Sequence, residues 1–426
     1  MNLPGAPFLA REGGELRLEG HALAELASRF GTPLYVYSRS AMRDAFQAYE
    51  RALQGRRHLV CYAMKANSSL AVLQTFAQAG AGFDIVSGGE LARVLAAGGD
   101  ASRVVFSGVG KTRAEMHQAL QAGVRCFNVE SAPELDTLNA EALALGCRAP
   151  VSLRVNPDVD AGTHPYISTG LKGNKFGIAH GQAVAAYRHA ASLPGLHVVG
   201  IDCHIGSQIT QLAPYLDALD RLLDLVEEVE AAGIPIHHVD VGGGLGITYT
   251  DETPPAAAVM VKALLQKLDA RGHGHRELLF EPGRSLVGNA GVLVTEVLVL
   301  KPSQVDDGGK NFCIVDAAMN DLMRPALYEA WMRIEPCTQR GDVSPHTWDV
   351  VGPVCESGDW LGRDRRLAVA CGDKLAVLSA GAYGMAMASN YNTRPRAAEV
   401  MVDGPRVHLI RAREELRSLF AGERLL

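Results

Sequence analysis

The sequence lacks the features that mark membrane, secreted and nucleic-acid-binding proteins. Its most apolar run, AGVLVTEVLVL at 290–300, is shorter than the roughly 20 residues that a membrane-spanning helix needs, and it contains Glu296. The first residues, MNLPGAPFLAREGG, have no basic start followed by an apolar segment, so we expect no secretory signal. Lys and Arg number 41 against 47 Asp and Glu, and this net charge of −6 predicts neither nucleic acid nor an anionic membrane as a partner.

The sequence also lacks the cysteine pattern of a disulfide-bonded or zinc-binding protein. Its eight cysteines include no CxxC pair, and in a chain of this length they indicate reduced thiols in a cytoplasmic protein. Hydrophobic residues make up 47% and charged residues 21%, which is typical of folded globular proteins and excludes a disordered chain. At roughly 150 residues per domain, the length predicts two or three domains.

Between residues 59 and 281 the chain repeats one pattern. A short run rich in β-branched or aromatic residues, which predicts a strand, precedes an amphipathic or Ala/Leu-rich segment, which predicts a helix. Ser or Thr stands at helix starts and Gly follows helix ends, as in SSLAVLQTFAQAG and TRAEMHQALQAG. The predicted strands are LVCYAM (59–64), GFDIVS (82–87), VVFSG (104–108), CFNVE (126–130), VSLRV (151–155), VVGIDCH (198–204), IHHVDV (236–241) and ELLFE (277–281). Eight such units in a row predict a closed parallel (β/α)₈ barrel of the TIM type.

An open doubly wound sheet is the alternative fold, because it also alternates strands with helices. The count of eight and the absence of an early GxGxxG favour the barrel. After about residue 285, strand-like runs are broken by Gly, Asp and Pro with little helix between them, which predicts a mostly antiparallel β-domain. We therefore predict an N-terminal segment at 1–32 that adds to the β-domain, the barrel at 33–284 and the C-terminal β-domain at 285–426.

If the fold is a barrel, candidate active-site residues should follow the strands, because active sites of such barrels lie at the C-terminal strand ends. Lys65 follows the first predicted strand and His204 ends the sixth. The triplet Gly242, Gly243 and Gly244 follows the seventh strand, and the eighth leads into EPGR at 281–284. We expect a lysine, a glycine loop and the Glu281 carboxylate to meet at one mouth of the barrel.

Each of these groups also has an ordinary structural explanation. Taken alone, Lys65 is typical of a solvated surface residue. His204 is equally compatible with a core histidine, and the glycine triplet with a tight turn. Together they are the groups that pyridoxal 5'-phosphate requires, because an amine binds its aldehyde, N–H groups bind its phosphate and an acid binds its ring nitrogen.

The chain resembles the fold-type III (alanine racemase-like) pyridoxal phosphate enzymes and, within them, the diaminopimelate decarboxylase family. Nine segments in family order carry this resemblance: YAMKAN, FDIVSGGEL, THPYISTGLKGNKFGI, HIGSQI, VDVGGGLGI, EPGRSLVGNAG, DAAMNDLMRPALYEA, CESGDWL and GAYGMAMASNYNTRPRAAEV. Gly162 and Gly288 depart from the family pattern, which has His and Ala there. The resemblance implies decarboxylation of meso-2,6-diaminopimelate to L-lysine and CO₂, the last step of lysine biosynthesis, by a homodimer whose active sites are shared across the interface.

The resemblance also implies which residues bind the cofactor. Lys65 would hold it covalently, and Asp84 would orient Lys65, although Asp84 would also suit a cap of the next helix. His204 would stack on the ring, and Glu281 would pair with the ring nitrogen. An acid keeps that nitrogen protonated, whereas a racemase of this fold has Arg there, so Glu281 favours decarboxylation. The remaining contacts would come from Ser207, Gly244, Gly283 and Arg284 at the phosphate and from Tyr383, whose ordinary explanation is a core aromatic residue.

Two further assignments concern the reaction and the substrate. Cys355 would reach the active site from the partner subunit and return a proton after CO₂ leaves, a task that suits a thiol; a lone Cys in a strand-rich stretch is otherwise usually a buried hydrophobe. The distal end of the substrate would meet Arg284, Arg324, Tyr328, Glu356 and Tyr383, with the arginines on its carboxylate and Glu356 on its ammonium group. Arg324 would otherwise form a surface ion pair.

Several other functions compete with this one. An ornithine, arginine or carboxynorspermidine decarboxylase would share the fold, but it would leave an arginine pair without its carboxylate. A non-catalytic pyridoxal phosphate carrier would need only a single barrel. A metal-dependent hydrolase is suggested by His237, His238, His273 and His275, yet no HxH or HExxH occurs and adjacent histidines in a strand face opposite ways. We therefore expect no metal.

Overall fold

The structure is a computed structural model that describes residues 3–160, 174–303 and 309–426. The chain forms two compact units: one contains Ala45–Ile247 and Thr253–Ser285, and the other contains Met1–Asp44, Thr248–Glu252 and Leu286–Leu426. No helix in the described ranges is long and apolar enough to cross a membrane. Gly162 and most of the predicted motif at 163–178 lie outside the described residues.

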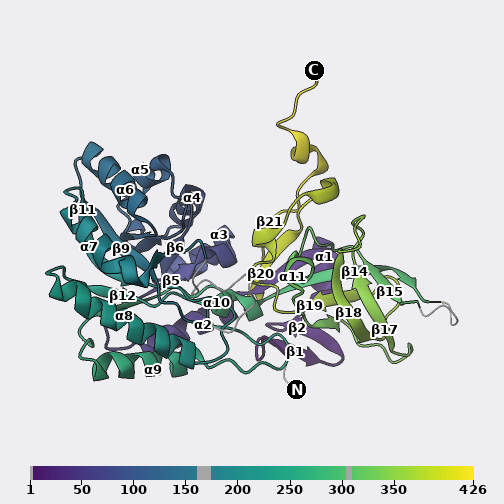
Figure 1. The fold of residues 1–426 in the computed structure, drawn as a ribbon. Coiled ribbons are helices and arrows are strands. Elements are labelled where there is room, and N and C mark those ends of the chain that lie inside the picture. Colours follow the sequence, from purple (N-terminus) through teal and green to yellow (C-terminus); the bar gives the residue numbers. More distant parts are fainter. Residues whose placement is uncertain (1–2, 161–173, 304–308) are drawn as a thin grey trace. The chain divides into compact units, whose positions relative to one another are not determined.

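Eight parallel strands close into a barrel in the first unit (Figure 1). The strands pair in the order β5-β6-β7-β8-β9-β11-β12-β13, and β13 pairs with β5 to close the ring. The prediction of a (β/α)₈ barrel is confirmed, and the open doubly wound sheet is wrong because the sheet has no free edge between β13 and β5. The barrel strands are β5 (His58–Ala63), β6 (Gly82–Ile85), β7 (Val104–Phe106), β8 (Cys126–Val129), β9 (Ala149–Asn156), β11 (Leu196–Asp202), β12 (His238–Asp240) and β13 (Glu277–Phe280), and the short β10 (Ile178–Ala179) pairs with β9.

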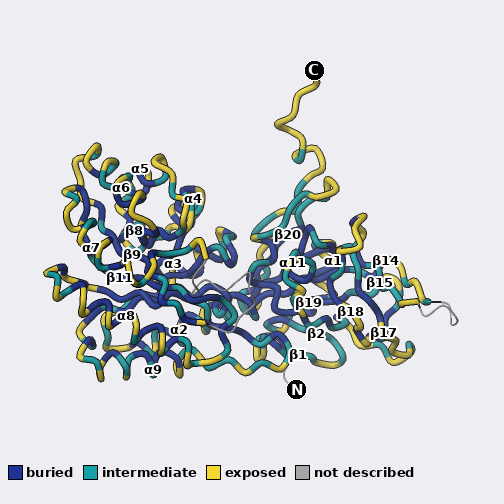
Figure 2. The backbone as a smooth tube through the Cα atoms, in the orientation of Figure 1, coloured by how far each residue is buried: buried dark blue, intermediate teal, exposed yellow. Residues whose placement is uncertain are grey.

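Helices follow the strands and lie around the outside of the barrel, with their outer faces exposed (Figure 2). Thr112 caps α5 with a capping box that includes Glu115, and Gly123 ends this helix in the left-handed conformation at φ 73°. Ser87 and Ser131 accept N-cap hydrogen bonds in the same way. The helices of this part of the chain are α2 (Arg39–Ala52), α3 (Leu70–Gln78), α4 (Gly88–Ala96), α5 (Arg113–Ala122), α6 (Ala132–Ala144), α7 (Ala183–Ser192), α8 (Ala213–Ala231), α9 (Ala257–Ala270) and α10 (Arg284–Val287).

The interior of the barrel changes from apolar to polar along the strands. Leu59, Cys61, Val105, Cys126 and Leu279 form one buried apolar cluster. Because side chains two residues apart on a strand face the same way, the next inward positions toward the carboxyl ends are polar. They include Ser107 after Val105, Asn128 after Cys126 and Glu281 after Leu279. The polar layer therefore lies at the end of the barrel where active sites of this fold occur.

The second unit is rich in β-structure, and most of its strand pairs are antiparallel. Its main sheet runs in the order β18-β17-β15-β14-β4-β20-β21, and β19 pairs with β14 and β16. Residues 3–32 supply a three-stranded sheet followed by one helix, and both pack into the same apolar core as the main sheet of this unit. The elements are β1 (Leu9–Glu12), β2 (Glu15–Leu18), β3 (His21–Ala22), α1 (Leu23–Phe30), β4 (Leu34–Ser38), β14 (Gly291–Lys301), β15 (Phe312–Val315), α11 (Arg324–Tyr328), β16 (Ile334–Pro336), β17 (His346–Val351), β18 (Trp360–Leu367), β19 (Lys374–Val377), β20 (Ala398–Asp403) and β21 (Arg406–Arg411).

The compact units and the predicted domains begin at different residues. The sequence predicts 33–44 as part of the barrel, whereas β4 lies between β14 and β20 in the main sheet of the second unit. All five residues of β4 are buried there. A short apolar strand has the same local pattern in either sheet, so only its long-range pairing decides which unit contains it.

Candidate active site

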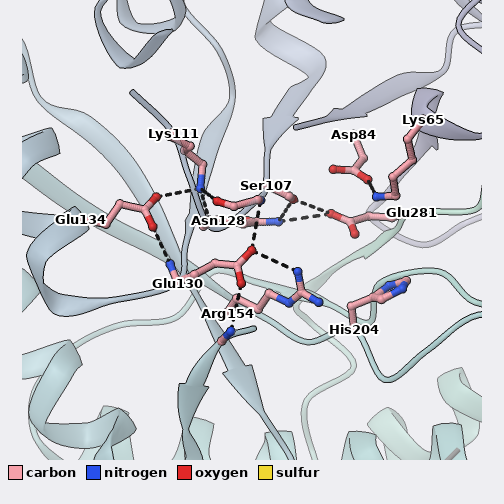
Figure 3. Close-up of polar contacts among 12 residues, drawn as sticks. Lys65, Asp84, Ser107, Lys111, Asn128, Glu130, Glu134, Arg154, His204 and Glu281 are labelled. Carbon is pink, nitrogen blue, oxygen red and sulfur yellow. Dashed lines mark hydrogen bonds and ion pairs between the residues drawn. The ribbon is translucent and has the colours of Figure 1, made fainter. Parts of the chain in front are cut away.

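Lys65 lies in a single 3₁₀ turn, Met64–Ala66, directly after β5. Its Nζ donates to Asp84 Oδ2 over 2.5 Å, and Asp84 is fully buried at the end of β6 (Figure 3). The Lys65 side chain keeps 36% of its surface exposed, so the amine is oriented by a buried acid while it remains accessible. Asp84 does not cap the next helix, because Ser87 does.

Glu281 follows β13 and is buried against two polar side chains from the opposite arc of the barrel (Figure 3). Its Oε1 accepts from Asn128 Nδ2 over 3.2 Å and from Ser107 Oγ over 3.4 Å. Burial raises the pKa of Glu281 well above its ordinary value, and the nearby Asp240 and Asp84 carboxylates raise it further. Sequence reasoning missed Ser107 and Asn128, although polar residues at the ends of apolar strands were a usable signal.

His204 follows β11 and presents a neutral ring. The backbone N–H of Gly243 donates to His204 Nδ1 over 3.1 Å, so this nitrogen carries no proton. Burial lowers the pKa of His204 well below its usual value, with Arg154 and Lys65 adding to the effect. An uncharged, fixed imidazole is suited to stacking on a flat aromatic ring.

The glycine triplet after β12 is packed against two other strand ends. A Cβ on Gly243 would stand 2.1 Å from the carbonyl oxygen of Glu281. Gly244 has φ +97°, and a Cβ there would stand 2.3 Å from the carbonyl oxygen of Gly206. Hydrogen bonds between Ile209 and the backbone of 244–246 join this loop to the loop after β11. The triplet is thus a tight turn that also brings backbone close to the strand ends.

Arg284 and Ser207 meet beside this turn. Arg284 is 5% exposed, and its Nη2 donates to Ser207 Oγ over 2.9 Å. Gly283 lies against the backbone of Ala63, because a Cβ on Gly283 would stand 3.0 Å from the carbonyl oxygen of Ala63. A hydroxyl, a guanidinium and backbone N–H groups are the donors that phosphate-binding sites use.

A second buried network supports the polar layer from β7 to β9 (Figure 3). Glu130 accepts from Arg154 Nη1 over 3.1 Å and from the backbone N–H of Gly108 and Gly177. Lys111 Nζ is buried and donates to Glu134 over 2.7 Å and to two carbonyl oxygens. These residues, which sequence reasoning did not single out, hold the loops that follow three neighbouring strands.

In the second unit, Arg324 opens the short helix α11 and is buried. Its Nη1 donates to the hydroxyl of Tyr249 over 2.8 Å, and its guanidinium lies 4.7 Å from the centre of the Tyr249 ring. The alternative of a surface ion pair is therefore wrong for Arg324. Tyr328 ends the same helix and is partly exposed. Tyr249 was not predicted, because nothing local to it indicates a partner 75 residues away.

Cys355 and Glu356 lie together on the exposed loop between β17 and β18. Cys355 is exposed, so the alternative of a buried hydrophobe is wrong, and its Sγ lies 3.6 Å from Asn392 Oδ1. Glu356 accepts a hydrogen bond from the hydroxyl of Tyr391. The buried Asp359 anchors this loop, because its carboxylate accepts from the backbone N–H of Met319 and Val354.

Tyr383 lies in the same unit, in the loop before a 3₁₀ turn at Met385–Met387. It is partly exposed and has φ +56°, a conformation that non-glycine residues rarely adopt. Such backbone strain is retained where the surrounding structure requires it, and it often occurs at functional sites.

Comparisons with known proteins agree with this arrangement. Residues 39–288 match the family described as "Pyridoxal-dependent decarboxylase, pyridoxal binding domain". The chain is 60% identical to a diaminopimelate decarboxylase of Pseudomonas aeruginosa over 97% of each chain. It is 59% identical to that of Vibrio cholerae over 98% of this chain and 99% of the other.

Solved structures give the same result. The diaminopimelate decarboxylase of M. jannaschii in complex with L-lysine superposes with a TM-score of 0.93 at 38% identity, covering 99% of both chains. The Helicobacter pylori enzyme, also complexed with L-lysine, gives a TM-score of 0.88 at 42% identity over 93% of this chain and 98% of that one. The chain belongs to the diaminopimelate decarboxylase family of pyridoxal-dependent decarboxylases.

Proposed function

We propose that this protein decarboxylates meso-2,6-diaminopimelate to L-lysine and CO₂ with pyridoxal 5'-phosphate as its cofactor. One observation carries the proposal: the ends of different barrel strands bring together an amine on a buried acid (Lys65 and Asp84), a second buried acid (Glu281) and a glycine turn. The named relatives support the choice of substrate.

The residues present fit the cofactor at each of its functional groups. Lys65 would bind the aldehyde carbon, and Asp84 would hold the Lys65 amine in place. The phosphate would lie among Ser207, Gly244, Gly283 and Arg284, while His204 would cover the ring and Tyr383 would contribute a further contact. The turn tolerates no side chain at Gly243 or Gly244, so its backbone packs directly against the strand ends from which the proposed phosphate contacts come.

Glu281 decides what the cofactor does in this site. When bound, pyridoxal phosphate supplies an aromatic system that takes up the electron pair left by CO₂. Asn128 and Ser107 donate to one oxygen of Glu281 and so orient its carboxylate. An ionised Glu281 would keep a proton on the ring nitrogen, and this favours decarboxylation over racemisation.

Cys355 would return a proton to the α-carbon after CO₂ has left. Its exposed position on an anchored loop fits a residue that completes the active site of a second copy of the chain. The active form would then be a homodimer with shared active sites. General acid catalysis of this kind needs a donor whose pKa lies near the working pH, and a thiol meets this requirement.

The substrate carries an amino-acid group at both ends, and the distal group needs its own partners. Arg324 and Arg284 would bind the distal carboxylate, with Tyr328 and Tyr383 adding contacts and Glu356 accepting from the distal ammonium group. Arg324 is buried, so a substrate without a distal carboxylate would leave its charge poorly compensated. This disfavours ornithine and arginine. We also propose that the protein acts in the cytoplasm, where lysine is made.

A CO₂-release assay with meso-diaminopimelate, ornithine, arginine and carboxynorspermidine tests the substrate. We expect lysine as the product and a kcat/KM at least about 100-fold higher for diaminopimelate than for the others. Comparable turnover of ornithine would refute the substrate assignment.

Borohydride reduction of the cofactor-loaded protein tests the site. The label should appear on the peptide that contains Lys65, should be absent in K65R and should persist in K262R, a control at an exposed lysine of α9. A label on another peptide would place the cofactor elsewhere.

A further inference from the structure

Two buried aspartates beneath Glu281 have no role in the proposed reaction. Asp202 ends β11 and Asp240 ends β12, and the two residues are register partners on neighbouring strands. Their exposures are 1% and 0%. One oxygen from each of Asp202, Asp240 and Glu281 lies within 4.8 Å of the others. Like charges at directly opposite strand positions are unfavourable, so this arrangement needs an explanation.

The charges in the polar layer do not balance. Five buried carboxylates face it: Asp84, Glu130, Asp202, Asp240 and Glu281. Lys65 is paired with Asp84, and Arg154 is paired with Glu130. Within the described ranges, no lysine or arginine forms an ion pair with Asp202, Asp240 or Glu281. Three adjacent buried carboxylates without a cation cannot all be ionised, so at least one must carry a proton.

The hydrogen bonds indicate which of the three carries it. Glu281 Oε1 accepts from Asn128 and Ser107, and these bonds favour the ionised form. Asp240 Oδ1 accepts from the backbone N–H of Gly242 over 2.9 Å. The other Asp240 oxygen, Oδ2, and Asp202 Oδ1 are buried without a hydrogen-bond partner. A proton on one of these two oxygens would remove an unsatisfied buried charge.

The electrostatics of the site agree with this geometry. Burial raises the pKa of all three carboxyl groups, that of Asp240 to about 7 and those of Asp202 and Glu281 well above their usual values, so the cluster must hold a proton. The hydrogen bonds to Glu281 are what favour the aspartates as its carriers. Several titratable and charged groups face the aspartates and Glu281 from the surrounding elements. They are Cys61 (β5), Lys65 (after β5), Asp84 (β6), Cys126 (β8), Glu130 (after β8), Arg154 (β9), Tyr187 (α7) and Cys203 (after β11). More of these groups are acidic than basic.

We propose that Asp202 and Asp240 share one proton beneath Glu281, and that this proton, by removing one of their two negative charges, weakens the repulsion on Glu281 and so favours its ionised carboxylate. The pair acts through Glu281 and does not touch the cofactor, so Asp202 and Asp240 are positioning residues. The importance of the pair for catalysis rests on the role proposed for Glu281, whereas the shared proton is a property of the chain itself.

A divalent cation is the competing explanation, because three carboxylates are also a common ligand set. Asn128 and Gly242 donate to one oxygen of Glu281 and one of Asp240, respectively, so a cation would have to use the other oxygen of each carboxylate. A proton between the two unpartnered aspartate oxygens satisfies them with no further ligand. Metal binding by the variants below separates the two explanations.

Infrared spectroscopy of the full chain, with and without pyridoxal phosphate, tests the shared proton. At about pH 6 we expect the carbonyl band of a protonated carboxylic acid, because the pair still holds its proton there. Labelling aspartate carboxyl groups with heavy carbon should shift this band, and labelling glutamate should not. A band that moves with the glutamate label, or no band at all, would overturn the proposal. This readout stays valid whatever substrate the enzyme uses.

Isosteric variants locate the proton. The band should persist in E281Q and in the exposed control D217N, and it should lose intensity in the double variant D202N/D240N. Asp321, whose pKa burial raises to about 6, contributes equally to all of these proteins and cancels in the difference spectra. Loss of the band in E281Q alone would place the proton on Glu281 and contradict the proposal. Binding of Mg²⁺ or Mn²⁺ by the wild type but not by the double variant would instead show a metal site.

The pH dependence of thermal unfolding gives a second readout. A carboxyl group with a raised pKa in the folded state holds its proton there after the unfolded chain has lost it, so its stabilising effect disappears as the pH rises through the folded pKa. The melting temperature of the wild type should therefore fall between about pH 5 and about pH 8, and D202N/D240N should show a flatter dependence. D217N should keep the wild-type dependence. Equal dependences in the wild type and the double variant would contradict the shared proton.

Discussion

The contact between Gly243 and Glu281 gives a prediction whose size follows from the structure. The variant G243A would place a Cβ 2.1 Å from the carbonyl oxygen of Glu281 and 2.9 Å from its carbonyl carbon. An ordinary van der Waals contact begins near 3.4 Å, so the two backbone segments must separate by about 1.3 Å. Neither neighbour is a flexible side chain that could rotate away. Overpacking of this kind costs about 2–3 kcal/mol.

The displacement should change both stability and cofactor binding. For a unit of this size, about 2–3 kcal/mol lowers the melting temperature by about 5–10 °C. Because the same backbone carries the Glu281 side chain, the affinity for pyridoxal phosphate should fall as well. Circular dichroism on heating and absorbance titration with the cofactor measure the two effects.

A matched glycine provides the control. Gly181 lies in the 3₁₀ turn His180–Gln182, and a Cβ there would have no atom within 4 Å. G181A should be neutral or slightly stabilising, since alanine only reduces the freedom of the unfolded chain. If G243A melted within about 1 °C of the wild type, the close packing of the glycine turn against the Glu281 backbone would be refuted.

Three further variants test other parts of the structure. C355A should still bind substrate but release lysine about 10²–10⁴-fold more slowly, and a normal turnover would place the proton donor elsewhere. R324A should weaken the binding of diaminopimelate by about 2–5 kcal/mol, measured as a rise in KM, and the exposed control R366A should leave KM unchanged. If R324A kept the wild-type preference for diaminopimelate over ornithine, Arg324 would not belong to the distal site. E130Q should lower the free energy of unfolding by about 3–5 kcal/mol, because it leaves the buried Arg154 without its partner. E141Q is the control: its partner Arg113 is 67% exposed, so the free energy of unfolding should change by only about 0–1 kcal/mol. Equal effects of E130Q and E141Q would contradict the importance of the buried pair.

Local signals in the sequence were sufficient for the barrel. Its strands include runs such as 59–63 and 104–106 that are almost wholly apolar, because both faces of the sheet are covered. Helix boundaries followed from capping chemistry, as at Thr112 and Gly123, where a side chain or a left-handed residue satisfies the end of one helix. These features depend on neighbours within a few residues, which is why they could be predicted.

Local signals were insufficient to show which sheet contains β4 and how the predicted N-terminal strands pair. The residues of β4 pair with β14 and β20, some 250 and 360 residues away along the chain. The sheet of residues 9–22 pairs within itself and is joined to the C-terminal part of the chain by a bridge between Glu15 and Thr338. The strand pattern of either segment is compatible with several partners, so the pattern could not choose between them.

In the candidate site, too, the sequence identified some residues, whereas only the structure showed their contacts. Lys65, His204, the glycine triplet and Glu281 could be found because they directly follow or end predicted strands. Ser107 and Asn128 could have been noticed as polar residues at strand ends, but their contact with Glu281 could not be predicted, since that residue is 174 and 153 residues away. Asp202 and Asp240 are visible in the sequence as charged residues in apolar runs, but that signal alone does not show that the two lie together.

By itself, the sequence determined the alternation of strands and helices, the caps, and which residues stand at the strand ends, because periodicity and capping act over one or two turns of chain. Only the tertiary structure decided that β13 pairs with β5, that Asn128 and Ser107 reach Glu281, and that two aspartates lie opposite each other beneath it. Closing the barrel sets the distances between residues far apart in sequence, and those distances decide which carboxylates are paired, which are desolvated and which must share a proton.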